Sequence, residues 1–171
     1  MDNIAAAPLT LALIGAGLAG RSLAAQAVRA GHRVVLEDVL PSKLRDALAE
    51  IETAGMPGTL VTVTTIEDAV READLVVEFM PDELESKLEI ACMVDRMAPP
   101  KSVLCLQTRV LSIGDLASCT YRADRCIAVQ LGADEALLVR GAKTTDETAQ
   151  LVERFWRSVC AQVTVREEVL V

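Results

Sequence analysis

Short runs of β-branched and leucine residues alternate along the chain with longer stretches in which apolar residues recur every three or four positions. Continuously apolar runs are typical of strands covered on both faces, and their alternation with amphipathic stretches is typical of parallel strands joined by crossover helices. The pattern therefore predicts an α/β fold with a doubly wound, mostly parallel sheet. The expected strands are Thr10–Ile14, Arg33–Glu37, Val61–Thr64, Leu75–Glu78, Val103–Leu106, Cys126–Gln130, Ala136–Val139 and Gln162–Arg166.

The stretches between these strands predict helices with recognisable ends. The first helix is expected from about Leu18 to Ala30, where Gly31 can close it in a left-handed conformation. Three later helices should begin where one side chain can meet the backbone N–H three positions further on. These pairs are Asp82 with Glu85, Ser112 with Asp115, and Thr144 with Glu147.

A G-x-G-x-x-G motif follows the first expected strand directly and opens the first helix, with its glycines at Gly15, Gly17 and Gly20. Gly15 allows a tight turn, Gly17 leaves space for backbone to approach a pyrophosphate, and Gly20 lets the helix pack closely on the strand. The first helical turn, at Leu18 and Ala19, supplies free N–H groups to phosphate. In this context the motif predicts a Rossmann-type, dinucleotide-binding fold. The alternative is a purely structural glycine turn.

The second strand is followed by Asp38, about 20 residues past the glycines, where a carboxylate can accept hydrogen bonds from the adenosine ribose. A carboxylate there favours NAD over NADP, because it would repel the extra phosphate. Glu37 is the competing carboxylate and leads to the same cofactor. Arg21, in the first helical turn, is expected to be solvated or salt-bridged.

Composition narrows the range of partners. The 171 residues are enough for one sizeable core but too few for two ordinary domains, so a single NAD-binding domain is expected over residues 1–171. The net charge of -8 argues against binding nucleic acid or an anionic membrane surface, where clustered Lys and Arg are needed.

The cysteines indicate a reducing, cytoplasmic location, because their number is odd and no close pair has metal-ligand spacing. They are Cys92, Cys105, Cys119, Cys126 and Cys160. The apolar start from Ile4 to Gly20 is not expected to be a leader peptide, since it carries no basic segment before it and is interrupted by Pro8.

Further motifs accompany the glycines. They are Ile14-Gly15-Ala16-Gly17, Gly20-Arg21, Ala30-Gly31-His32-Arg33-Val34-Val35-Leu36, Asp38, Ala73-Asp74-Leu75-Val76-Val77-Glu78, Pro81, Leu84, Lys87 and Leu111-Ser112-Ile113. In these motifs the chain resembles the NAD-binding domain of the 3-hydroxyacyl-CoA dehydrogenases along nearly its whole length. The resemblance implies that Asp38 binds the adenosine ribose and that Glu78 and Lys87 lie near the nicotinamide-side ribose. Without it, Glu78 is equally a strand-end carboxylate and Lys87 a solvated helix residue.

The same resemblance implies a catalytic serine, histidine and glutamate, and this chain departs from all three. The family segment N-T-S-S is Gln107-Thr108-Arg109-Val110, so Arg109 stands at the serine position. Gln130 stands at the histidine position and Leu137 at the glutamate position. The amide of Gln130 cannot exchange a proton near neutral pH. The chain's one histidine, His32, is expected on the surface in a turn at the amino end of the second strand, away from the ligand-binding edge.

Three functions follow from these departures. The favoured one is an NAD(H)-binding subunit or redox sensor that is weak or inactive as a catalyst alone. The second is an active NAD-dependent oxidoreductase on a hydroxyacyl or oxoacyl thioester, completed by self-association or a partner chain. In the third, Arg109 binds an anionic substrate such as a carboxylate or phosphate; a solvated or salt-bridged arginine is the alternative.

The resembled enzymes continue into a helical domain that covers the cofactor and forms the dimer, whereas this sequence ends at Val171. We therefore expect an apolar face near Leu131, Leu137, Leu138 and Val171, which a second copy or a partner chain would cover. The alternative is that these are core strand positions, above all Leu138.

Overall fold

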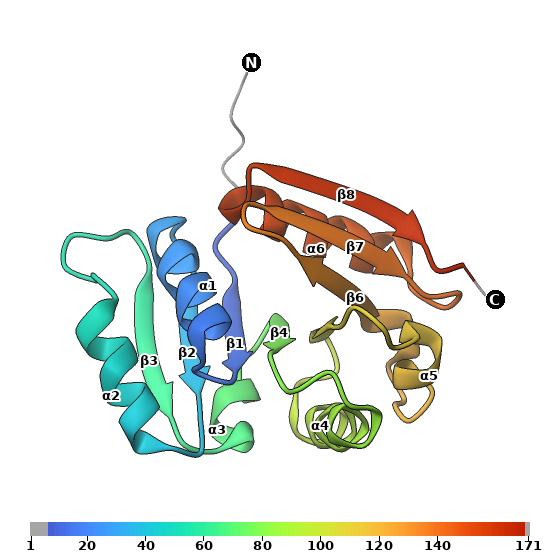
Figure 1. Ribbon diagram of the computed structural model, residues 1–171, viewed down its shortest axis with the longest axis horizontal. Helices are drawn as coiled ribbons and strands as arrows, with labels where there is room; N and C mark the ends of the chain where they lie inside the picture. The colour runs from blue at the N-terminus through green and yellow to red at the C-terminus, as the bar shows by residue number, and fades with distance from the viewer. Residues whose placement is uncertain (1–6, 170–171) are drawn as a thin grey trace.

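The computed structural model describes residues 7–169 and contains one eight-stranded sheet with the order β3-β2-β1-β4-β5-β6-β7-β8 (Figure 1). Each neighbouring pair is parallel except β6 and β7, which are antiparallel. The predicted α/β fold with a mostly parallel sheet is confirmed. The strands are β1 (Thr10–Ile14), β2 (Arg33–Glu37), β3 (Thr59–Val63), β4 (Leu75–Glu78), β5 (Val103–Gln107), β6 (Cys126–Leu131), β7 (Glu135–Arg140) and β8 (Gln162–Glu167).

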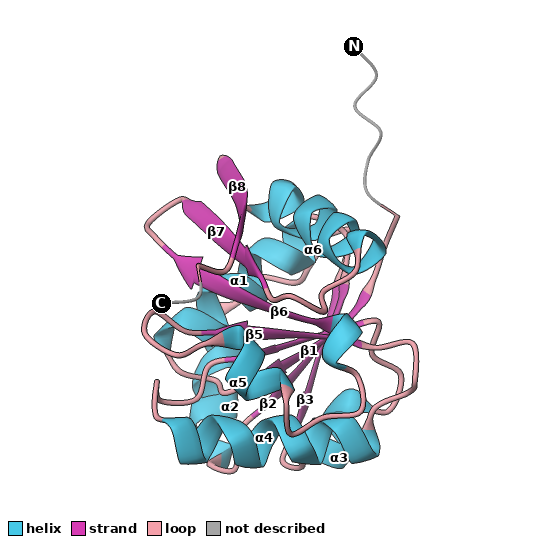
Figure 2. Cartoon of the chain, turned by 90° about the vertical axis from the view of Figure 1, so that its right-hand side faces the viewer, coloured by secondary structure: helices cyan, strands magenta, loops and turns pink. Residues whose placement is uncertain are grey.

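Helices cover both faces of this sheet. They are α1 (Leu18–Arg29), α2 (Pro41–Glu50), α3 (Ile66–Val70), α4 (Leu84–Met97), α5 (Ile113–Ala117), the 3-10 helix η1 (Ala123–Arg125) and α6 (Asp146–Val159). The core under α1, α2 and α6 takes Leu11 and Leu13 from β1, while the core under α3, α4 and α5 takes Ala12 and Ile14. Figure 2 shows α6 and the α3–α4 pair on opposite sides of the strands. Because successive side chains alternate between the two faces and both faces are covered, the central strands are apolar except at their ends.

The sheet has its switch point at β1, with β2 and β3 on one side and β4 on the other. In open α/β sheets, ligands bind at such a point, outside the carboxyl ends of the strands. The register places Ile14 beside Glu37 on β2 and beside Glu78 on β4. The ends of these three strands form the floor of the expected cofactor crevice.

Several element boundaries differ from the sequence-based expectation. β3 begins at Thr59, two residues earlier than expected, because it pairs with β2 from Arg33 onward. Neither α2 nor α3 was expected. α2 buries only Leu44 and Ala47 among its own residues, and α3 has five residues, so neither gives a strong apolar period.

Two of the three expected helix starts are wrong in detail. Ser112 caps α5 as expected, accepting a hydrogen bond from the Asp115 N–H. Thr145, not Thr144, caps α6, because the Thr144 hydroxyl instead donates to the Cys126 carbonyl at 2.7 Å. α4 begins at Leu84 without a side-chain cap; the Asp82 carboxylate is used elsewhere, as described below.

His32 is buried, which corrects the expectation of a surface residue. It does lie at the amino end of β2, but its side chain packs edge-on against Phe155 of α6. Its Nδ1 accepts a hydrogen bond from the Leu9 N–H at 3.1 Å, and its Nε2 lies 3.0 Å from the Ser158 hydroxyl. His32 therefore joins the start of the chain's first strand to α6, far from the crevice.

The expected apolar face is only partly present. Leu131 and Leu137 are half-buried, whereas Leu138 is fully buried and belongs to the core under α6, as the alternative held. Val171 lies outside the described residues, as does the beginning of the apolar segment that starts at Ile4. Within residues 7–169, none of the helices has the length and apolar character needed to cross a membrane.

Candidate functional site

The glycine turn has the geometry of a phosphate cradle. Gly15 has a φ of +102°, and its N–H donates to the Glu37 carbonyl at 2.8 Å, which fixes the turn on β2. A Cβ on Gly20 would lie 1.9 Å from the Gly15 carbonyl oxygen, so only glycine fits where α1 crosses the turn. A Cβ on Gly17 would meet no described atom within 4 Å. Space at Gly17, next to the N-terminus of α1, is therefore open to a ligand.

Asp38 joins the glycine turn to the β2–α2 connection. Its Oδ2 accepts a hydrogen bond from the Ala16 N–H at 2.9 Å, and its Oδ1 accepts one from the Leu40 N–H at 3.0 Å. Burial by itself would raise the pKa of Asp38, but these two hydrogen bonds and the ammonium of Lys43 outweigh it and hold the pKa below its usual value. Asp38 is thus a fixed carboxylate at the edge of the crevice.

Glu37 points to the other face of the sheet, the face that Val35 shares with α3. It is buried, and burial together with the charge of Asp38 raises its pKa to about 7. Asp38, one residue later, lies on the side of the glycine turn. The geometry favours Asp38 over Glu37 as the residue next to a bound dinucleotide.

Arg21 is salt-bridged, one of the two states expected for it. Its Nε lies 3.1 Å from Glu50 Oε2, so it ties α1 to α2. Leu18, by contrast, is four-fifths exposed at the start of α1, next to the crevice.

Glu78 and Lys87 form a buried ion pair at the carboxyl end of β4. Lys87 Nζ donates to Glu78 Oε1 at 2.7 Å and to the Met80 carbonyl at 3.1 Å. The Glu78 carboxylate also accepts hydrogen bonds from the Met80 and Gln107 N–H groups. Burial raises the pKa of Glu78, against the opposing effects of the Lys87 ammonium and these N–H groups. Both side chains have zero exposure, so a contact with the cofactor ribose stays a prediction.

Asp82 ties the loop after β4 to the loop after β5. It accepts hydrogen bonds from the Thr108 hydroxyl and, at 2.8 Å, from the Arg109 N–H. Burial would raise the pKa of Asp82, but the bonds from Thr108 and Arg109 dominate and lower it. The motif analysis missed this role, because nothing in the spacing of Asp82 and Thr108 signals a contact between two separate loops.

The three positions that depart from the catalytic pattern lie together. Gln130 on β6 and Leu137 on β7 are direct partners across the antiparallel pair. Arg109 Nη2 donates to the Leu131 carbonyl, next to Gln130, at 2.6 Å. This arrangement supports assigning them to one site, and it contains an amide and an alkyl group where the resemblance implies a histidine and a glutamate.

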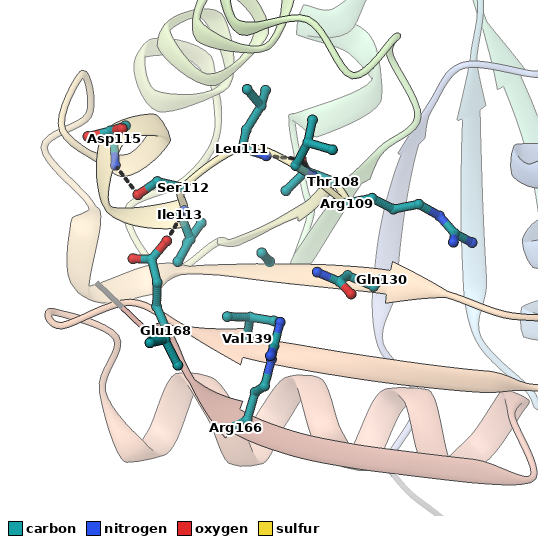
Figure 3. Close-up of a pocket in the computed structure, with 13 residues that line it drawn as sticks. Thr108, Arg109, Leu111, Ser112, Ile113, Asp115, Gln130, Val139, Arg166 and Glu168 are labelled. Carbon is teal, nitrogen blue, oxygen red and sulfur yellow. Dashed lines mark hydrogen bonds between the residues drawn. The ribbon is translucent and has the colours of Figure 1, made fainter. Parts of the chain in front are cut away.

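A cavity of about 500 Å³ opens beside these residues, between the β5–α5 loop and β6, β7 and β8 (Figure 3). Arg109 and Gln130 also line a second cavity of about 330 Å³ over Leu137 and Thr164. Sequence reasoning missed Arg166 and Glu168, which line the first cavity from the end of β8 and the segment after it. Arg166 is the last residue of the final expected strand and Glu168 follows it, and neither belongs to a recognisable motif.

A family model described as "3-hydroxyacyl-CoA dehydrogenase, NAD binding domain" matches residues 10–169. Among curated proteins, the chain is 29% identical over 156 residues to a probable 3-hydroxybutyryl-CoA dehydrogenase of Bacillus subtilis, covering 79% of this chain and 54% of that protein. It is 26% identical over 168 residues to the 5-formyl-3-hydroxy-2-methylpyridine 4-carboxylate 5-dehydrogenase of Mesorhizobium japonicum, covering 87% of this chain and 54% of that protein. The chain thus spans about half the length of these relatives.

Among solved structures, the 3-hydroxyacyl-CoA dehydrogenase of Archaeoglobus fulgidus is similar with a TM-score of 0.82 and 28% identity. The similarity covers 95% of this chain and 58% of the other.

Proposed function

The chain belongs to the 3-hydroxyacyl-CoA dehydrogenase family through its NAD-binding domain, and we propose that it acts as an NAD(H)-binding subunit or redox sensor with little or no catalysis of its own. NAD is the cofactor of this family. Bound NAD supplies hydride transfer; holding the cofactor and moving protons are the tasks of the protein's own residues.

The residues present fit this cofactor. The open space at Gly17 and the N–H groups of Leu18 and Ala19 at the start of α1 would receive the pyrophosphate. Asp38, anchored by the Ala16 N–H, would accept hydrogen bonds from the adenosine ribose. Glu78 and Lys87 would act indirectly on the nicotinamide side of the site, by fixing the backbone at Met80 and Gln107.

The observation that carries the non-catalytic part is the pairing of Gln130 with Leu137. Oxidation of an alcohol requires a group that takes the hydroxyl proton, and a base that titrates near neutral pH is the efficient choice. Gln130 has no such protonation step, and Leu137 cannot orient or charge-stabilise a base. His32 cannot substitute, because it is buried at the opposite end of β2.

Calorimetric titration with NAD and NADH tests cofactor binding. We expect one nucleotide per chain, with binding weakened at least about tenfold in Asp38→Asn through loss of charge-assisted hydrogen bonds. Asp46→Asn is the matched control, because Asp46 is exposed on the neighbouring helix α2, and it should bind like the wild type. Failure of the unaltered chain to bind either nucleotide would leave the glycine turn a purely structural feature.

The second candidate is an active oxidoreductase. In one form it acts on a hydroxyacyl or oxoacyl thioester, as the name of the B. subtilis relative suggests; in the other it acts on an anionic substrate at Arg109. The second form is supported by the name of the M. japonicum relative, a dehydrogenase of a pyridine carboxylate. NADH consumption with acetoacetyl-CoA, and not with acetoacetate, would favour the thioester form.

We also propose a cytoplasmic location and an assembly in which a second copy or partner chain covers the half-buried Leu131 and Leu137. Support comes from the 330 Å³ cavity that both residues line, although Leu131 packs on the α6 side of the sheet and Leu137 on the opposite side. Light scattering at high concentration should give at least a dimer, or a complex once a partner is added. A monomer under all conditions would contradict the assembly and leave cofactor binding untouched.

A further inference from the structure

The cavity of about 500 Å³ has a floor made of one row of residues across three strands. Ala128 on β6 is the partner of Val139 on β7, and Val139 is the partner of Arg166 on β8. Gln130, two residues after Ala128, lies on the same face. Figure 3 shows Arg166 pointing from β8 across β7 toward β6, into this cavity. A cavity of this size holds a small molecule.

Arg166 brings a positive charge that its neighbours do not neutralise. Glu167, the residue after it, reaches Arg140 at 3.5 Å. The Glu168 carboxylate accepts hydrogen bonds from the Ile113 and Gly114 N–H groups at 2.8 and 3.2 Å. Within residues 7–169, Arg166 has no carboxylate within 4 Å, and its guanidinium stays available to a ligand.

Arg109 adds a second positive charge at the other end of the cavity. Figure 3 places it at the opposite end from Ser112 and Asp115, with Gln130 between Arg109 and the Val139–Arg166 row. Its Nη2 is held by the Leu131 carbonyl, which fixes the guanidinium and leaves its other N–H groups free to donate. The amide of Gln130 can donate or accept a hydrogen bond, and its alkyl neighbours Ala128 and Val139 provide an apolar floor.

We propose that this cavity binds a small-molecule carboxylate, with Arg166 as its anchor and Gln130 and Arg109 beside it. A guanidinium presents parallel N–H donors that match the two oxygens of a carboxylate, whereas the carbonyl of a thioester is neutral and needs no cation. This inference rests on the proposed function in one respect: the carboxylate would lie next to the NAD(H) that the proposed function places in the crevice.

The test is a ligand-observed NMR titration with acetoacetate, with and without saturating NADH. We expect acetoacetate to bind the unaltered chain and methyl acetoacetate, its neutral ester, to bind at least about tenfold more weakly. Arg166→Gln should weaken acetoacetate binding by a similar factor. Arg154→Gln should bind like the wild type, because Arg154 is exposed on α6, on the opposite side of the sheet.

Folding of each variant is verified from the fluorescence of the buried Trp156, and Arg166→Lys, which keeps the charge, should retain part of the affinity. Several results would overturn the inference: no binding of acetoacetate, equal binding of its ester, unchanged binding by Arg166→Gln, or inorganic phosphate binding at least as tightly as acetoacetate. NADH titrated alone separates the two proposals, since acetoacetate binding without NADH binding would refute the proposed function and leave this inference standing.

Discussion

Lys87 Nζ lies 2.7 Å from Glu78 Oε1, and neither side chain has any exposed surface. The pair holds α4 on β4 and, through the Gln107 N–H, holds the ends of β4 and β5 together. It is therefore part of the framework beneath the cofactor crevice. The family resemblance implies that both residues lie near the nicotinamide-side ribose, but it indicates neither their pairing nor their complete burial.

Replacement of Lys87 by Met should destabilise the protein by about 3–5 kcal/mol, because it leaves the Glu78 charge buried without a cation. Lys101→Met removes the cation from the exposed pair with Asp74 and should cost less than about 1 kcal/mol. Urea unfolding followed by Trp156 fluorescence measures both. Equal and small losses would mean that the buried pair does not support the fold.

Two glycine variants should separate folding from ligand binding. Gly20→Ala places a Cβ 1.9 Å from the Gly15 carbonyl oxygen, so the turn must move and we expect a loss of about 1–3 kcal/mol. Gly17→Ala meets no described atom within 4 Å and should leave stability nearly unchanged. It should nevertheless weaken NADH binding, because the added methyl occupies the space kept for phosphate. A Gly17→Ala variant that binds NADH like the wild type would contradict this assignment of the turn.

His32 should make stability fall in acid. Burial lowers its pKa in the folded state, so below pH 6.5 the unfolded chain takes up a proton that the folded chain resists. His32 therefore contributes its full share to the free energy of unfolding above pH 6.5, and this share decreases as the pH falls toward the folded-state pKa. His32→Asn should remove this contribution. Ser158→Ala, which deletes the hydroxyl next to Nε2, should lower stability while keeping the pH dependence.

Glu37 should act in the opposite direction. Its pKa is raised to about 7 in the folded state by burial and by Asp38, so the folded chain binds a proton more readily than the unfolded chain. The stabilisation that comes from this tighter proton binding is complete below pH 4.5 and is lost as the pH rises through about 7. Glu37→Gln should be more stable than the wild type at pH 8, with a smaller advantage at pH 5. The exposed Glu89→Gln provides the control, and an equal gain there would refute the explanation.

The parts of the site that could be predicted from sequence are those encoded by short local patterns. The turn from Gly15 to Gly20 and the carboxylate at Asp38 follow from a strand, a helix start and a strand end. The burial of His32 depends on α6, which lies more than a hundred positions later in the chain, and the bond between Asp82 and Thr108 joins two separate loops. Such contacts leave no periodic signal.

Arg166 was missed for a related reason. On sequence it is the charged last residue of the final expected strand, and such residues are ordinarily solvated. Only the register of β8 on β7, which sets Arg166 beside Val139, places it in the same cavity as Gln130. The helices α2 and α3 escaped prediction because each buries few apolar residues.

The fluorescence of NADH, followed over time in the presence of the protein and acetoacetyl-CoA, tests the central claim most directly. Binding in the crevice should raise the fluorescence. Reduction of the oxoacyl group needs a proton donor for its carbonyl oxygen, and the absence of one at Gln130 should keep the fluorescence constant afterwards. A rise that persists after the thioester is added is the result predicted here. No rise would contradict cofactor binding, and a steady decay dependent on the thioester would show that the chain is an active dehydrogenase.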